Sequence, residues 1–262
     1  MKTATKISYR DSHTYPAKGA EYERHYETQA WDRFLWSRER EILLKILAKY
    51  FASRDVHLLD FACGTGRITS LLEDCVTTST GVDVSSSMLA VARQKLKHTE
   101  IIEADITVDN IFKPKPFNFI TAFRFFLNAE PELRSMTIET LADLLTDDGI
   151  LVFNNHHNLG SPWIKLLHTR HRQKNPEGTF NVMSIEQMKD LVESAGLKIA
   201  ELYPVGFFHP PKVPVSYRLN RVIDNIACKF KCLDRFSENP IVVCRKRIKH
   251  QNCISNEIVD SM

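Results

Sequence analysis

Short apolar segments alternate with helical patterns along most of the chain, and this alternation limits the fold more than any other feature. Apolar runs that suit strands buried on both faces occur at residues 57–62, 79–83, 100–104, 118–126 and 149–155. Segments with the spacing or the caps of helices separate or follow them, at 66–73, 86–96, 132–145 and 184–196. Strands of this kind joined by helices are typical of a parallel sheet with crossover connections. The sequence therefore predicts an α/β fold.

Further elements are expected on both sides of this pattern. Residues 27–51 have apolar positions that suit one or two helices packed on the main domain. Two more strands are expected at 197–203 and 241–247, with a helical segment at 216–231 between them, whereas the stretch 159–179 is irregular. With 262 residues, the chain is long enough for one large domain.

The composition is that of an ordinary soluble protein, with 43% hydrophobic and 26% charged residues. A formal net charge of +3 is too small to indicate a nucleic-acid-binding surface. Residues 1–10 match neither a signal peptide nor a membrane anchor, and the six cysteines lack the spacing of a zinc site or a disulfide framework. We therefore expect a cytoplasmic protein with no bound metal, and neither a membrane nor a nucleic acid as its partner.

The first strand runs into a glycine-rich turn, Gly64-Thr65-Gly66, which precedes a helix. Such a turn brings the backbone close to a ligand and directs helix amides at it, although a tight strand-to-helix turn also needs glycine for structural reasons. Asp83 ends the next strand, 19 positions after Gly64, where a carboxylate can accept hydrogen bonds from both hydroxyls of a ribose. A capping or solvated aspartate is the structural alternative.

Three further residues narrow the kind of nucleotide. Dinucleotide enzymes favour a third glycine where this chain has Thr69, so Thr69 disfavours a pyrophosphate. Asp60, just before the turn, would repel a pyrophosphate and suits a ligand with a cationic amino group. Asp105 closes the third strand, where it can accept a hydrogen bond from an adenine amino group. The pattern therefore indicates a nucleoside that carries an amino acid.

Residues 58–66, 81–84, 104–106 and 117–126 together resemble the motifs of class I S-adenosylmethionine-dependent methyltransferases. The resemblance implies a doubly wound, seven-stranded, mostly parallel sheet whose last strand is antiparallel, with S-adenosyl-L-methionine as the cofactor. By position in these motifs, the implied cofactor-binding residues are Asp60, Ala62, Gly64, Gly66 and the Phe123 carbonyl around the methionine part, Asp83 at the ribose, Asp105 and Ile106 at the adenine edge, and Val84 and Met88 against the purine ring. Met88 equally suits the core of its own helix.

The resemblance also implies how the chain is divided. Residues 1–50 would form a helical lid segment in which Tyr22 covers the carboxylate end of the cofactor, with aromatic helix packing as the alternative. The other expected parts are a cofactor-binding domain at 51–248, with acceptor-side insertions at 156–180 and 204–232, and a tail at 249–262.

Four residues are candidates for catalysis or for contact with the methyl acceptor. Methyl transfer from a sulfonium is an in-line displacement, so the enzyme aligns the acceptor and, for a hydroxyl, removes its proton. His156 and His157 follow the fifth strand and His209 lies in a proline-rich loop, each with a solvated or packed loop histidine as the alternative. Arg124 stands in an apolar run, where it either contacts an acidic acceptor or the cofactor carboxylate, or pairs with a local acid such as Glu130.

These features predict an enzyme that methylates a small polar molecule, with an anionic or sugar-like acceptor that carries a hydroxyl. Methylation of a nucleic acid or a protein is one alternative, and a nucleotide-binding protein without activity is another. The low net charge disfavours a nucleic acid, and so does the sequence Arg124-Phe125-Phe126-Leu127 where a base-clamping motif would stand.

Overall fold

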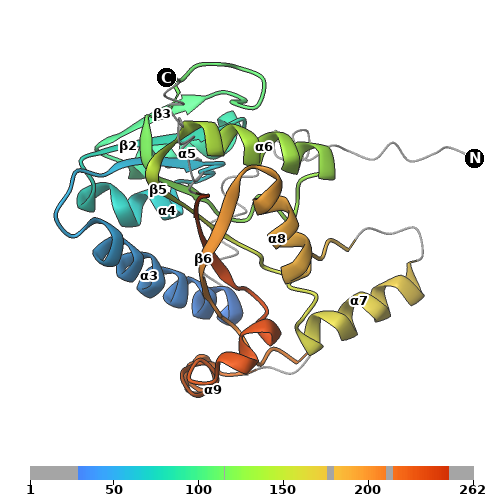
Figure 1. Cartoon of the computed structure of the whole chain (residues 1–262). Helices are drawn as coiled ribbons and strands as arrows, with labels where there is room; N and C mark the ends of the chain where they lie inside the picture. Colours follow the sequence, from blue (N-terminus) through green and yellow to red (C-terminus); the bar gives the residue numbers. More distant parts are fainter. Residues whose placement is uncertain (1–28, 115, 176–179, 211–214, 248–262) are drawn as a thin grey trace, which may run out of the picture.

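The computed structural model describes residues 29–114, 116–175, 180–210 and 215–247. Their centre is a seven-stranded sheet in the order β3-β2-β1-β4-β5-β7-β6 (Figure 1). The strands are β1 (His57–Phe61), β2 (Thr78–Asp83), β3 (Thr99–Glu103), β4 (Phe117–Ala122), β5 (Leu145–Asn154), β6 (Leu197–Tyr203) and β7 (Ile241–Lys246). Strand β7 pairs antiparallel with β5 and β6, while the other pairings are parallel. The expected mostly parallel sheet with an antiparallel last strand is confirmed.

Helices cover both faces of the sheet. The long helices are α3 (Ala30–Phe51), α5 (Ser86–Lys95), α6 (Pro131–Leu144), α7 (Pro162–Lys174), α8 (Ile185–Ser194) and α9 (Tyr217–Ala227), beside the short α4 (Arg67–Leu72). Helices α3 and α4 pack into one apolar core, and α6 and α8 into the core on the other face. Side chains of successive strand residues point to opposite faces, so each buried strand contributes to both cores.

The single helix α3 occupies the segment where one or two helices were expected. It places Phe34, Leu43 and Ile46 on the sheet, where all three are fully buried. The helical part of the N-terminal segment is therefore integral to the core of the domain. Tyr22 lies outside the described residues.

Two expectations about elements were wrong in detail. The stretch 159–179 was expected to be irregular, but Ser161 caps helix α7 by accepting a hydrogen bond from the Ile164 amide. Strand β4 ends at Ala122 instead of continuing to residue 126, because the chain turns at Arg124, whose φ is +62°. Among the described residues, no helix is long and apolar enough to cross a bilayer.

The strand order determines where a ligand can reach the sheet. Strand β1 lies between β2 and β4, so the connections that leave β1 and β4 go to opposite faces of the sheet. Open α/β sheets bind ligands in the crevice at such a switch point, outside the carboxyl ends of the strands. The glycine-rich turn follows β1 directly and therefore lies in this crevice.

Candidate functional site

The two glycines of the turn have different roles. Both have positive φ, +57° at Gly64 and +75° at Gly66. A Cβ atom on Gly66 would lie 2.9 Å from the Cδ1 atom of Leu96, so Gly66 allows the start of α4 to pack closely against the end of α5. A Cβ atom on Gly64 would meet no atom within 4 Å. Gly64 therefore borders open space, while Gly66 is required by packing.

Two open cavities adjoin the turn, and Ala62 and Asp83 line both of them. The first has about 460 Å³ of empty space and is mainly apolar, with Val84, Phe125 and Leu133 in its wall and Asp105 at its polar side. The second has about 580 Å³ of empty space, and its wall includes Asp60, Gly64, Arg67, Met88, Phe123 and Arg124. A mainly apolar cavity beside a more polar one suits a flat ring joined to a charged group.

Asp83 stands at the partition between the cavities. Its Oδ2 atom accepts a hydrogen bond from the Gly64 amide at 2.9 Å, and its Oδ1 atom accepts one from the Ser85 amide at 2.8 Å. These amides orient the carboxylate at the end of β2, in the wall that the two cavities share. The carboxylate can therefore accept hydrogen bonds from ligand hydroxyls on the cavity side.

Asp105 is held in a similar way at the end of β3. Its Oδ1 atom accepts hydrogen bonds from the Thr107 amide at 3.1 Å and the Thr107 hydroxyl at 2.6 Å. The neighbouring Ile106 is only 5% exposed and packs in the core beneath the cavity. Asp105 thus caps the turn that follows β3 and also lies in the wall of the first cavity.

Asp60 precedes the glycine-rich turn and is buried, with 1% exposure. The Thr121 hydroxyl donates to its Oδ1 atom at 2.7 Å, and the Thr69 hydroxyl donates to its Oδ2 atom at 2.5 Å. Burial raises the pKa of Asp60 to about 6, although these hydrogen bonds and the charge of Arg67 act in the opposite direction. The residue in the third-glycine position therefore positions the carboxylate that faces the second cavity.

Glu39 is a site residue that the sequence analysis missed. This α3 carboxylate has 0% exposure and lies 2.7 Å from the Arg67 Nη1 atom and 3.6 Å from the Arg124 Nη2 atom. Burial alone would raise its pKa, but the charges of Arg67 and Arg124 and hydrogen bonds from Arg67 and Asn239 hold that pKa below its ordinary value. A signal was present, since Glu39 falls four residues after Leu35 on the buried face of an amphipathic helix.

Arg124 has a strained backbone that its neighbours hold in place. The Asn154 Oδ1 atom accepts a hydrogen bond from the Arg124 amide at 2.7 Å, and the Asn128 side chain donates to the Arg124 carbonyl at 2.8 Å. A non-glycine residue with positive φ costs about 1–3 kcal/mol and is enriched at functional sites. Arg124 thus lies in the wall of the second cavity, with its Nη2 atom 3.6 Å from the Glu39 carboxylate.

His156 and His157 follow β5, the neighbour of β4 in the sheet. Burial, and then the positive charge of Arg124, lower the pKa of His156 well below its ordinary value of 6.5. Burial also lowers the pKa of His157, whose Nδ1 atom lies 3.2 Å from the Asn181 carbonyl oxygen. His156 is therefore neutral at physiological pH, close enough to Arg124 to be influenced by its charge.

His209 lies in the loop after β6. Its ring stacks on Trp31 with a centroid distance of 4.0 Å, and its Nδ1 atom lies 3.3 Å from the Glu238 Oε1 atom. The charges of Glu238 and His209 both influence His157. The three candidate histidines thus gather near the carboxyl ends of β5 and β6.

Most of the residues singled out in the sequence meet at these cavities. Those that line one or both are Asp60, Ala62, Gly64, Asp83, Val84, Met88, Asp105, Phe123 and Arg124. Among the described residues, five candidate site residues that the sequence singled out are in neither lining: Gly66, Ile106, His156, His157 and His209. The acid found beside Arg124 is Glu39, on a helix far from it in sequence, whereas the sequence had offered Glu130.

Comparisons with known proteins agree with this geometry. Residues 32–202 match the family described as a methyltransferase domain. An uncharacterized methyltransferase of Staphylococcus carnosus is 25% identical over 164 residues, which are 59% of this chain and 76% of that protein. A trans-aconitate 2-methyltransferase of Yersinia pseudotuberculosis is 29% identical over 119 residues, 45% of each chain. The chain thus matches less than half the length of that second relative.

Solved structures show the same fold. A S-adenosylmethionine-dependent methyltransferase of Thermotoga maritima, titled a possible histamine N-methyltransferase, aligns with a TM-score of 0.64 at 17% identity, over 90% of this chain and 99% of that one. Magnesium protoporphyrin IX methyltransferase of Synechocystis with bound S-adenosylhomocysteine aligns with a TM-score of 0.62 at 12% identity, over 91% and 99%. With the family match over more than half of the sequence, the chain belongs to the methyltransferase domain family, as a class I S-adenosylmethionine-dependent methyltransferase.

Proposed function

We propose that this enzyme methylates a hydroxyl group of a small polar molecule that carries negative charge or a sugar-like set of hydroxyls. The observation that carries the proposal is the partly buried, neutral His156, which lies near enough to Arg124 for its pKa to be lowered by the guanidinium charge. A neutral imidazole can accept the proton of a hydroxyl, and a guanidinium can hold an anionic group of the same molecule.

The two cavities suggest that different parts of the cofactor bind at different places in the site. S-adenosyl-L-methionine, when bound, supplies an electrophilic methyl group on a sulfonium. Asp83 would accept hydrogen bonds from the ribose, Asp105 and the Ile106 backbone would bind the adenine edge, and Val84 and Met88 would pack against the ring. The residues we assign to the methionine part are Asp60, Ala62, Gly64, Gly66 and the Phe123 carbonyl.

The proton of the acceptor hydroxyl would go to His156, with His157 and His209 as the other candidates. A base with a pKa below the working pH is neutral in nearly every molecule of the enzyme, but the same low pKa makes it a weaker proton acceptor than a histidine that titrates near neutral pH. Arg124 contributes to that state, since its charge disfavours protonation of His156. The imidazolium formed in the reaction would then return its proton to solvent.

The proposal is tested with S-adenosyl-L-methionine labelled in its methyl group. The purified full chain is incubated with hydroxy acids, sugar acids and neutral sugars, and separately with total RNA and with protein extract. We expect labelled product from at least one hydroxylated small molecule, most readily from an anionic one. Labelling of RNA or protein alone would show that the acceptor is a macromolecule, and cofactor binding without any labelling would favour a protein without activity.

A carboxylate is the second candidate acceptor. The relatives named trans-aconitate 2-methyltransferase match about 45% of this chain, and Arg124 suits a carboxylate of the acceptor. A carboxylate is already ionised at neutral pH and needs no general base. His156→Gln separates the two candidates: methylation of a hydroxyl should fall by about 10²- to 10⁴-fold, while methylation of a carboxylate should change little.

A further inference from the structure

Helix α9 turns its polar side to the protein and an apolar side outward. Its buried residues are Asn220, Asp224 and Ala227. The apolar residues on the outer side, each about half exposed, are Leu219, Val222, Ile226 and, just after the helix, Phe230. Their spacings of three and four residues form one continuous stripe. We call these four residues the α9 stripe.

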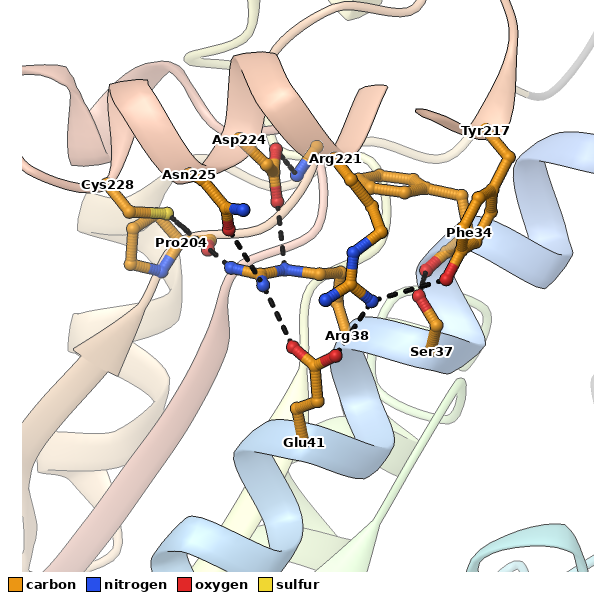
Figure 2. A network of polar contacts seen from close by, with 11 residues as sticks. Phe34, Ser37, Arg38, Glu41, Pro204, Tyr217, Arg221, Asp224, Asn225 and Cys228 are labelled. Atoms are coloured by element: carbon orange, nitrogen blue, oxygen red, sulfur yellow. Dashed lines mark hydrogen bonds and ion pairs between the residues drawn. The ribbon is translucent and has the colours of Figure 1, made fainter. Parts of the chain in front are cut away.

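Ionic contacts fix this orientation. The Arg38 Nε atom of α3 lies 3.3 Å from the Asp224 Oδ2 atom (Figure 2). The Gly206 amide donates to the Asp224 Oδ1 atom at 2.9 Å. Figure 2 also shows Glu41 of α3 between the guanidiniums of Arg38 and Arg221. Because the polar side of α9 is anchored at several points, rolling the helix to bury its stripe would break these contacts. Exposure of the stripe is therefore part of the fold.

Positive charge borders the stripe. At 100° per residue, Arg218 flanks it on one side. Lys229 follows just after the helix ends, and Lys231 and Arg235 follow in the 3₁₀ helix η2 (Lys231–Phe236); all four are exposed. Residues 217–236 contain two acids, Asp234 and the buried Asp224. An exposed apolar stripe with Lys and Arg along its edge is the pattern of a helix that lies in a membrane interface.

We propose that α9 and η2 form a peripheral binding face for an anionic lipid surface. The α9 stripe would enter the boundary between headgroups and acyl chains, and the flanking cations would lie at the lipid phosphates. The face is a contact on one leaflet, without any spanning segment. The proposal does not depend on which acceptor the enzyme methylates.

The charges argue against two other occupants of the stripe. In an antiparallel two-fold dimer formed through the stripe, the cations of both copies would lie along the same edge of the interface, which is unfavourable. Residues 1–28 hold five Lys or Arg and four Asp or Glu, so that segment does not complement a cationic border. Strand β7 leads the chain away from α9, because its last residue, Lys246, pairs with Leu197, the first residue of β6, whereas α9 follows the last residue of β6 in the chain.

The test is co-sedimentation of the full chain with vesicles. We expect binding to phosphatidylcholine vesicles that contain about one third phosphatidylglycerol, and binding at least about tenfold weaker to phosphatidylcholine alone. Raising the salt from about 0.1 to 0.5 M should also weaken binding severalfold, because it screens the cations. Ile226→Asp should abolish the binding, and Arg218→Glu combined with Lys229→Glu should reduce it about tenfold.

Met136→Asp is the matched control, because Met136 is an exposed apolar residue of α6, at 41% exposure, outside the stripe. It should bind vesicles as well as the unchanged protein does, and all variants should keep the same melting temperature within about 2 °C. The proposal is overturned if the unchanged protein does not sediment with anionic vesicles, or if Met136→Asp weakens binding as much as Ile226→Asp. A dimer at micromolar concentration that Ile226→Asp dissociates would overturn it in favour of a second copy.

Discussion

At the scale of single residues, Asp60 is expected to act in opposite directions on stability and on cofactor affinity. Its folded pKa of about 6 exceeds the ordinary 3.8, so its contribution to stability is present at low pH and is lost as the pH rises through 6. The cost at neutral pH is up to about 3 kcal/mol. Asp60→Asn should therefore raise the free energy of unfolding of the ligand-free protein at pH 7.5 by about 1–3 kcal/mol, measured by denaturant titration.

The same variant should bind S-adenosyl-L-methionine more weakly in calorimetry, because the ionised carboxylate favours a cationic amino group. In the unchanged protein, cofactor affinity should fall as the pH drops below about 6, where Asp60 takes up a proton. A variant with unchanged affinity at pH 7.5 would remove Asp60 from the cofactor site. Thr121 and Thr69 both hydrogen-bond this carboxylate and can also hydrogen-bond an asparagine amide, so local structure should persist.

The two glycines of the turn give a second contrast at this scale. Alanine at either position meets a left-handed backbone, which costs about 1–2 kcal/mol. Gly66→Ala should destabilise the protein further, since its Cβ atom would lie 2.9 Å from Leu96. Gly64→Ala should be the milder change in thermal melting but the more harmful one for cofactor affinity, because Gly64 lines the cavity. Equal melting temperatures for the two variants would contradict this division of roles.

At the scale of elements, Glu39 joins α3 to the two arginines that border the second cavity. Removing one partner of a buried ionic cluster leaves the remaining charges unpaired and away from water, and lowers the free energy of unfolding by about 3–5 kcal/mol. Glu39→Ala should lower the free energy of unfolding by this amount, measured by denaturant titration. Glu41→Ala on the same helix is the control, because Glu41 has a side chain that is 46% exposed, and it should cost less than about 1 kcal/mol. Similar losses in both variants would contradict the central position of Glu39.

The elements also show what the sequence could predict. Strands such as β1 and β4 were found because burial on both faces leaves a continuous apolar run, and the carboxyl ends of β1, β2 and β3 could be located from Asp60, Asp83 and Asp105. Helix α7 was missed because it buries only Ile164 and so has almost no apolar periodicity.

Contacts between segments that are distant in the sequence could not be predicted from sequence patterns. The Arg124–Glu39 approach joins residues 85 positions apart, and no spacing rule connects them. The expected helical segment at 216–231 is confirmed in part by α9, but the sequence did not say whether the apolar side of this helix faces the core. Here the Arg38–Asp224 pair turns the polar side inward. The expectation of no membrane partner rested on the lack of a membrane anchor and did not address this surface.

At the scale of the whole molecule, buried titratable groups oppose one another in their effect on stability below neutral pH. His156 and His157 have lowered pKa values, so the unfolded chain takes up protons that the folded chain does not, and stability is lost as the pH falls below 6.5. Asp60 and Asp224, both with a pKa raised to about 6, contribute stability that is lost as the pH rises from 3.8 through 6. Between about pH 4 and 6, a rise in pH increases the free energy of unfolding through the two histidines and decreases it through the two aspartates. The melting temperature should therefore change little in this range.

Replacing one residue of either pair should reveal how the titration of the other pair changes the free energy of unfolding with pH. His156→Gln should raise the free energy of unfolding at pH 5 by up to about 2 kcal/mol and leave it nearly unchanged at pH 8, because the neutral histidine costs nothing once the unfolded chain is neutral too. Asp60→Asn should do the reverse, with its gain at pH 8 and little at pH 4. Melting curves of both variants at these pH values test the idea. A gain for His156→Gln that is as large at pH 8 as at pH 5 would mean that packing, rather than titration, determines the effect of this histidine.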